Sequence, residues 1–173
     1  MILLGIGSNL ASKYGDRYQN IKLAIKYIEE NKIKIIKKSS FYETPSYPDI
    51  KKPKFINVVI EINTNLSFEH LVLKLLSIEE KLERKRNKKN DPRTCDIDII
   101  DYNSKVKIYN YNNSIFKVPH ESLSSRNFVL YPLMEILPDW LHPISKLNVK
   151  ELINNLNEDK KKSILKIEKD WYN

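Results

Sequence analysis

Residues 55–64 read FINVVIEINT, the clearest strand pattern in the chain. Successive side chains of a strand point to opposite faces, so the even-numbered residues, all Ile or Val up to position 62, share one face. Phe55 and Asn57 lie together on the other face. The pattern therefore predicts a strand with one face on an apolar core and an aromatic ring beside an amide on the opposite face.

Helical and strand patterns extend outward from this segment in both directions. Ser67 is a suitable N-cap for a helix with apolar residues at helical spacing, and an earlier amphipathic helix runs from Asp16 to about Asn31. Short apolar segments predict further strands within residues 2–7, 33–42 and 96–101. The order strand, helix, strand, strand, helix, strand predicts an α+β, ferredoxin-like βαββαβ core, with an antiparallel sheet and both helices on one face.

Length and composition predict one folded domain over residues 1–173. With 41% hydrophobic and 30% charged residues, the chain lies outside the disordered and fibrous classes. The net charge of +8 fits an anionic partner, either nucleic acid or a polyphosphate. Drift in the base composition of the gene would give the same excess of lysine. Cys95, the single cysteine, and the lack of a signal or membrane-spanning pattern predict a cytoplasmic protein with no membrane partner.

Residues 92–101 read PRTCDIDIID and place two carboxylates in an otherwise apolar strand. In a strand, Asp96 and Asp98 share one face with Cα atoms about 7 Å apart. The two charges repel each other unless a cation lies between them, and Mg²⁺ prefers few carboxylates together with water and phosphate oxygens. A solvated face of an edge strand is the alternative for such a pair. Asp101 points with Ile97 if the strand is regular, which leaves it out of the site.

Basic residues crowd the segment from Lys81 to Lys89, at the end of the second expected helix. Cations there suit the helix dipole, so a solvated helix end explains any one of them. Together they predict a phosphate-facing patch close to the acidic strand.

Ordered motifs run through most of the chain, at Gly7–Leu10, Ser40–Pro45, Phe55–Asn57, Ile78–Arg86, Pro92–Asp98, Val118–His120 and Arg126–Leu130. In these motifs, from about Leu3 to about Pro143, the chain closely resembles the 6-hydroxymethyl-7,8-dihydropterin pyrophosphokinase family of folate biosynthesis. The resemblance implies a ferredoxin-like α+β fold, with a core over about 1–143 and a C-terminal extension over about 144–173, and two Mg²⁺ ions. It also implies transfer of the β,γ-pyrophosphoryl group of ATP to the pterin hydroxymethyl, with release of AMP.

The resemblance also assigns residues to the reaction. It implies that Asp96 and Asp98 are the Mg²⁺ ligands and that Arg84 and Arg93 are the catalytic arginines. Guanidinium groups suit this role because they donate bidentate hydrogen bonds to a transferred phosphoryl group. The residues that it implies for ATP binding are Glu79, Arg86, Arg93, Ile99, His120 and Arg126.

For the pterin, the resemblance implies a site formed by Thr44, Pro45, Tyr47, Phe55, Asn57 and Phe128. A flat heteroaromatic ring needs stacking faces, here Phe55 and Phe128, and its edge needs a donor and an acceptor such as the Asn57 amide. Aromatic residues are more often part of a core, and a histidine beside a proline, such as His120, is more often structural. Phe55 and Asn57 depart from the first expectation because they alternate away from the Ile/Val face, and the ordered motif set reverses the second for His120.

Three segments depart from the family pattern: Asn90-Asp91 where many members have Trp-Gly, Ser46-Tyr47 where Pro-Leu is usual, and Lys117 where a hydroxyl residue is often seen. We expect a monomer whose partners are ATP and the pterin, with no nucleic acid. The alternative from another class of protein is a basic ferredoxin-like RNA-binding module without catalysis. The sequence argues against it, because the aromatic K/R-G-F/Y-type strand expected of such modules is missing. A non-catalytic relative is the third hypothesis.

Overall fold

The fold is built around the first strand of a six-stranded antiparallel sheet, in a computed structural model that describes residues 1–84 and 91–171. Strand β1 (Ile2–Ser8) pairs with β4 (Phe55–Asn63) on one side and with β5 (Asp96–Tyr102) on the other. The strand order is β5-β1-β4-β3-β8, and β2 also pairs with β4. The other strands are β2 (Lys34–Lys38), β3 (Phe41–Thr44), β6 (Lys107–Tyr111), β7 (Ser114–Val118) and β8 (Leu165–Ile167).

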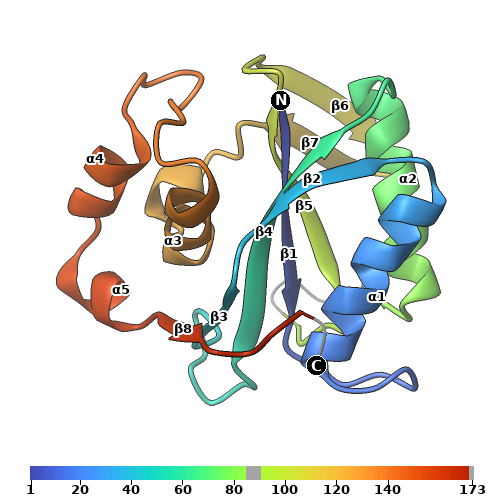
Figure 1. Ribbon diagram of the computed structural model, residues 1–173, viewed down its shortest axis with the longest axis horizontal. Coiled ribbons are helices and arrows are strands. Elements are labelled where there is room, and N and C mark those ends of the chain that lie inside the picture. Colours follow the sequence, from blue (N-terminus) through green and yellow to red (C-terminus); the bar gives the residue numbers. More distant parts are fainter. Residues whose placement is uncertain (85–90, 172–173) are drawn as a thin grey trace.

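Two helices, α1 (Arg17–Glu30) and α2 (Phe68–Lys81), cover one face of the sheet (Figure 1). Asp16 and Ser67 cap them, each accepting a hydrogen bond from a backbone N–H in the first turn. Their apolar stripes pack on the even-numbered Ile, Leu and Val side chains of β1 and β4 in one buried cluster. This arrangement confirms the predicted ferredoxin-like α+β fold.

The opposite face of the sheet is covered as well, by α3 (Asn127–Ile136) and α4 (Val149–Asn154) (Figure 1). Apolar residues of both helices pack against Leu3, Val59 and Ile100. A 3₁₀ turn, η1 (Leu123–Ser125), precedes α3, and α5 (Glu158–Lys162) follows α4. The C-terminal extension is thus folded onto the sheet, where β8 pairs with β3 and Trp171 packs on Phe41 with ring centroids 4.3 Å apart.

Two strand predictions need correction. The single strand expected within residues 33–42 is two strands, β2 and β3, interrupted at Ser39–Ser40. Strand β5 carries one extra residue: Leu4 pairs with Ile99 but Leu3 pairs with Asp101, so the register shifts at Ile100. The shift turns Asp101 toward the face covered by α3, where its carboxylate accepts a 2.7 Å hydrogen bond from Trp140 Nε1.

The β6–β7 hairpin lies outside the main sheet and packs Val118 against Phe68 and Val72 of α2. None of the helices that the structure describes is long and apolar enough to cross a membrane.

Candidate active site

Several of the predicted site residues lie on the sheet face opposite α1 and α2, where β1 carries glycine. Gly7 pairs with Asp96 on β5 and with Asn57 on β4, and Gly5 pairs with Asp98. A Cβ atom on Gly7 would lie 3.0 Å from Asn57 Oδ1 and 3.5 Å from the Phe55 ring. The missing side chain therefore leaves a floor of backbone between the carboxylates on one side and the amide and aromatic ring on the other.

Two arginines converge on Asp96. Arg84 Nη1 lies 2.6 Å from Asp96 Oδ1, and Arg93 Nη1 lies 3.1 Å from Asp96 Oδ2. Arg84 also forms an ion pair with the buried Glu79, whose Oε1 accepts a 2.7 Å hydrogen bond from the Ile97 N–H. Burial alone would lower the pKa of Arg84, but the charges of Asp96 and Glu79 outweigh it and raise that pKa. Arg84 is thus a permanent cation fixed between α2 and β5.

The second carboxylate has an arginine of its own. Arg126 Nη1 lies 3.1 Å from Asp98 Oδ2, and Arg126 Nη2 lies 3.0 Å from His120 Nε2. Burial and the Arg126 charge lower the pKa of His120. Desolvation by the surrounding atoms and the charge of Asp96 raise the pKa of Asp98, although half of its side-chain surface is open to solvent. The cleft therefore holds a pair of carboxylates that repel each other, surrounded by cations.

The aromatic side of the site is continuous with the charged side. The guanidinium carbon of Arg93 lies 5.3 Å from the centroid of Phe55, and that of Arg126 lies 5.5 Å from the centroid of Phe128. Asn57 Nδ2 donates a 3.0 Å hydrogen bond to Thr44 Oγ1, which fixes the amide on the floor. Each arginine thus bridges a carboxylate and an aromatic ring.

Residues 3–138 match the family model described as 7,8-dihydro-6-hydroxymethylpterin-pyrophosphokinase. The chain belongs to this family. Among curated proteins it is 37% identical to the 2-amino-4-hydroxy-6-hydroxymethyldihydropteridine pyrophosphokinase of Aquifex aeolicus, over 87% of this chain and 88% of that protein. It is 33% identical to the protein of the same name from Methylorubrum extorquens, over 79% of this chain and 82% of that protein.

Solved structures support the fold of the pyrophosphokinase family for this chain. The Plasmodium falciparum HPPK-DHPS A437G protein with pteroate aligns with a TM-score of 0.74 at 14% identity. The alignment covers 96% of this chain and 46% of that one, so this chain spans less than half of the larger protein. Family membership favours the enzyme over the alternative of an RNA-binding module.

Four predicted site residues remain to be placed, namely Pro45, Tyr47, Arg86 and Ile99. Arg86 lies outside the described residues. The side chain of Ile99 packs toward α1 and α2, on the face opposite the carboxylates. A contact of Ile99 with ATP would therefore have to come from its backbone. The Tyr47 side chain is 85% exposed in the loop after β3, and Pro45 is half-buried at the start of this loop.

Asn9 positions one of the site arginines, a role that the sequence did not predict. Asn9 is only 2% exposed, and its Oδ1 accepts a 2.7 Å hydrogen bond from the Arg93 N–H. Its Nδ2 donates to Ser46 Oγ at 3.2 Å and to the Pro53 carbonyl at 3.1 Å. Asn9 therefore ties the arginine to the loop that carries Tyr47. The motif Gly7–Leu10 marked the segment, but nothing in it indicated which side chain would be buried among three segments.

The donor set fits a magnesium–phosphate ligand. Within the described ranges, Arg93 Nε is buried without a hydrogen-bond partner, which leaves a donor for an anion. No group of three or more His, Cys, Asp or Glu side chains in the described part of the chain is arranged to hold a metal ion. A pair of carboxylates such as Asp96 and Asp98 suits Mg²⁺, whose remaining ligands are usually water and substrate phosphates.

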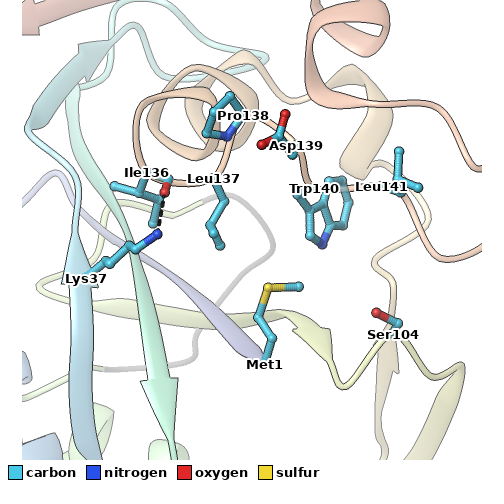
Figure 2. A pocket seen from close by; sticks show the side chains of 9 residues that line it. All are labelled: Met1, Lys37, Ser104, Ile136, Leu137, Pro138, Asp139, Trp140 and Leu141. Carbon is cyan, nitrogen blue, oxygen red and sulfur yellow. Dashed lines mark hydrogen bonds between the residues drawn. The ribbon is translucent and has the colours of Figure 1, made fainter.

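A pocket lies elsewhere, at the end of the sheet where β1 begins. It has a volume of about 340 Å³ and is lined by Met1, Lys37, Ser104 and residues 136–141 (Figure 2). Lys37 Nζ donates a 3.1 Å hydrogen bond to the Ile136 carbonyl at its rim. None of the predicted site residues lines this pocket, which is therefore separate from the group of charged and aromatic residues around Gly7.

Proposed function

We propose that the cleft above Gly7 is where this chain transfers pyrophosphate from ATP to the hydroxymethyl group of 6-hydroxymethyl-7,8-dihydropterin, the reaction of its family in folate synthesis. The observation that carries the assignment is the placement of Arg84 and Arg93 on the two oxygens of Asp96. An ordinary structural ion pair would need only one arginine for this carboxylate. Two arginines on Asp96, beside the second carboxylate of Asp98, instead form a site suited to a metal–polyphosphate complex.

Asp96 and Asp98 would hold Mg²⁺, and two ions are what the family resemblance implies. When bound, the ions neutralise phosphate oxygens and orient the triphosphate. The guanidinium groups of Arg84, Arg93 and Arg126 surround the carboxylates, where they can donate hydrogen bonds to the remaining phosphate oxygens. Such preorganised donors stabilise the charge that spreads over the transferred group as the bond to the AMP oxygen breaks.

The pterin would lie on the aromatic side of the same cleft. Phe55 and Phe128 offer faces for stacking, and the Asn57 amide, fixed by Thr44, can pair with the edge of the ring. This placement directs the hydroxymethyl oxygen toward the carboxylates. That oxygen forms the new bond to the β-phosphorus, the bond from the β-phosphorus to the AMP oxygen breaks, and the hydroxyl proton is released.

Calorimetry with a non-hydrolysable ATP analogue tests the metal assignment. We expect the wild-type chain to bind the analogue tightly only with Mg²⁺, because the carboxylates repel an uncompensated triphosphate. Asp96→Asn and Asp98→Asn should each remove the Mg²⁺ dependence. Asp139→Asn, a change of the same chemistry at the distant pocket, should leave it unaltered. Full Mg²⁺-dependent binding in both site variants would overturn the assignment.

A further inference from the structure

Asn127 stands between the two site residues that α3 contributes. It is the first residue of this helix, with Arg126 before it and Phe128 after it, and it is only 7% exposed. The helix begins without a side-chain cap from Arg126. Three consecutive residues share one stretch of backbone, so whatever fixes residue 127 also fixes the directions in which its neighbours leave the chain.

The Asn127 side chain is held by the C-terminal extension. Its Nδ2 donates a 2.7 Å hydrogen bond to the carbonyl of Lys160 and a 3.1 Å hydrogen bond to Ser163 Oγ. Its Oδ1 accepts a 2.8 Å hydrogen bond from the Phe128 N–H. Both donor hydrogens and the acceptor of the amide are thus used, and both partners of the donor lie in α5 or directly after it, on the same side of the sheet as α3 (Figure 1).

Further contacts join the same two segments. Lys160 Nζ donates a 2.8 Å hydrogen bond to the Ser125 carbonyl, just before α3, and Lys166 Nζ lies 3.3 Å from Glu135 Oε1 near the helix end. The extension is itself fixed to the sheet, because β8 pairs with β3 and Trp171 Nε1 donates a 3.0 Å hydrogen bond to the Ser39 carbonyl. The turn that binds Asn127 is therefore held in place by contacts with both α3 and the sheet.

We propose that Asn127 is a positioning residue which, bound to the turn Lys160–Ser163, holds Arg126 on Asp98 and presents the Phe128 ring to the pterin. The inference rests on the proposed roles of Arg126 and Phe128 in the cleft. It gives the C-terminal extension, which lies beyond the region matched by the family model, a part in substrate binding.

The test compares Asn127→Ala, Ser163→Ala and the double variant in steady-state kinetics. Asn127→Ala should raise the KM for both ATP and the pterin about threefold to tenfold, the range expected for lost hydrogen bonds, with kcat changed by less than about twofold. The double variant should have KM values close to those of Asn127→Ala, because the hydrogen bond between Asn127 and Ser163 is already lost in the single variant. The control is Asn31→Ala, which removes a 2.8 Å hydrogen bond to the Tyr27 carbonyl at the end of α1 and should leave both KM values unchanged.

Arg126→Ala and Phe128→Ala, measured in parallel, separate the two ways of failing. Unchanged KM values in Asn127→Ala, beside raised values in these two variants, would overturn the positioning role alone. Unchanged values in all three would instead overturn the proposed roles of Arg126 and Phe128. Should Asn127→Ala fail to fold, Ser163→Ala decides, with about a twofold rise in both KM values supporting the inference and no change contradicting it.

Discussion

A single methyl group at Gly7 should weaken pterin binding while leaving the fold intact. The Cβ atom of an alanine there would lie 3.0 Å from Asn57 Oδ1 and 3.5 Å from the Phe55 ring. Asn57 cannot simply turn away, because its Nδ2 is bonded to Thr44 Oγ1. Gly7 is not among the residues with positive φ, so alanine can adopt its backbone conformation. The strain therefore falls on the amide that is proposed to read the pterin edge.

The size of the effect follows from the contacts. A separation of 3.0 Å requires the amide to move by a few tenths of an ångström, which misaligns its hydrogen bonds to the ring. Losing one or both of these costs about 1–3 kcal/mol, or roughly a fivefold to 150-fold rise in the KM for the pterin. Alanine loses less chain entropy on folding than glycine, by about 0.5–1 kcal/mol, which offsets the local strain and keeps the free energy of unfolding within about 1 kcal/mol.

Gly5→Ala is the matched control, in the same strand and on the same face. Its Cβ atom would meet only the flexible end of the Ile100 side chain, at 3.2 Å, so the pterin KM should stay as in the wild type. Steady-state kinetics with the pterin varied at saturating Mg-ATP, together with thermal melting of each variant, gives both quantities. A folded Gly7→Ala enzyme with an unaltered pterin KM would refute the placement of the pterin over this floor.

Three further outcomes follow from particular contacts. Arg84→Lys should lower kcat by at least about tenfold, because an ammonium group lacks the planar fork of N–H donors that the guanidinium, held by Glu79 and Asp96, offers to phosphoryl oxygens; steady-state turnover checks this, and an unchanged kcat would argue against the role of the arginine. Burial lowers the pKa of His142, so the unfolded chain takes up a proton near pH 6.5 before the folded chain does. The contribution of His142 to stability is therefore fully present above pH 6.5 and is lost as the pH falls below that value. Urea unfolding between pH 7.5 and 5 should therefore show a shallower pH dependence in His142→Gln, and an identical slope would contradict the shift. Ser67→Ala, which removes the α2 cap, should lower the free energy of unfolding by about 1 kcal/mol without changing KM, and a variant as stable as the wild type would speak against the cap.

The fold was predictable where burial imposes a period on the sequence. Ile and Val recur at every second position from Ile56 to Ile62 because one face of β4 meets the core. Ser67 marks the start of α2 because its hydroxyl accepts a hydrogen bond from a backbone N–H of the first turn. The bulge at Ile100 was not predictable, since one extra residue leaves no compositional trace yet turns Asp101 to the other face. The C-terminal strand depends on tertiary contacts, such as Trp171 on Phe41, that no local pattern encodes.

For the site, strand spacing and motif order predicted residues that the fold brings within bonding distance. Arg93, Asp96 and Asp98 converge with Arg84 and Arg126 although they come from separate elements. The supporting residues were not predictable, because an asparagine becomes a buried anchor only through its surroundings. Asn9 and Asn127 each join segments far apart in the sequence, and neither differs in sequence from a surface asparagine.

The nature of the product made from ATP tests the central claim most directly. With Mg-ATP and 6-hydroxymethyl-7,8-dihydropterin, the wild-type chain should release AMP in a one-to-one ratio with the pterin diphosphate, and Asp96→Ala should release neither. Formation of ADP, or undiminished AMP release by the Asp96→Ala variant, would contradict pyrophosphoryl transfer at this pair of carboxylates.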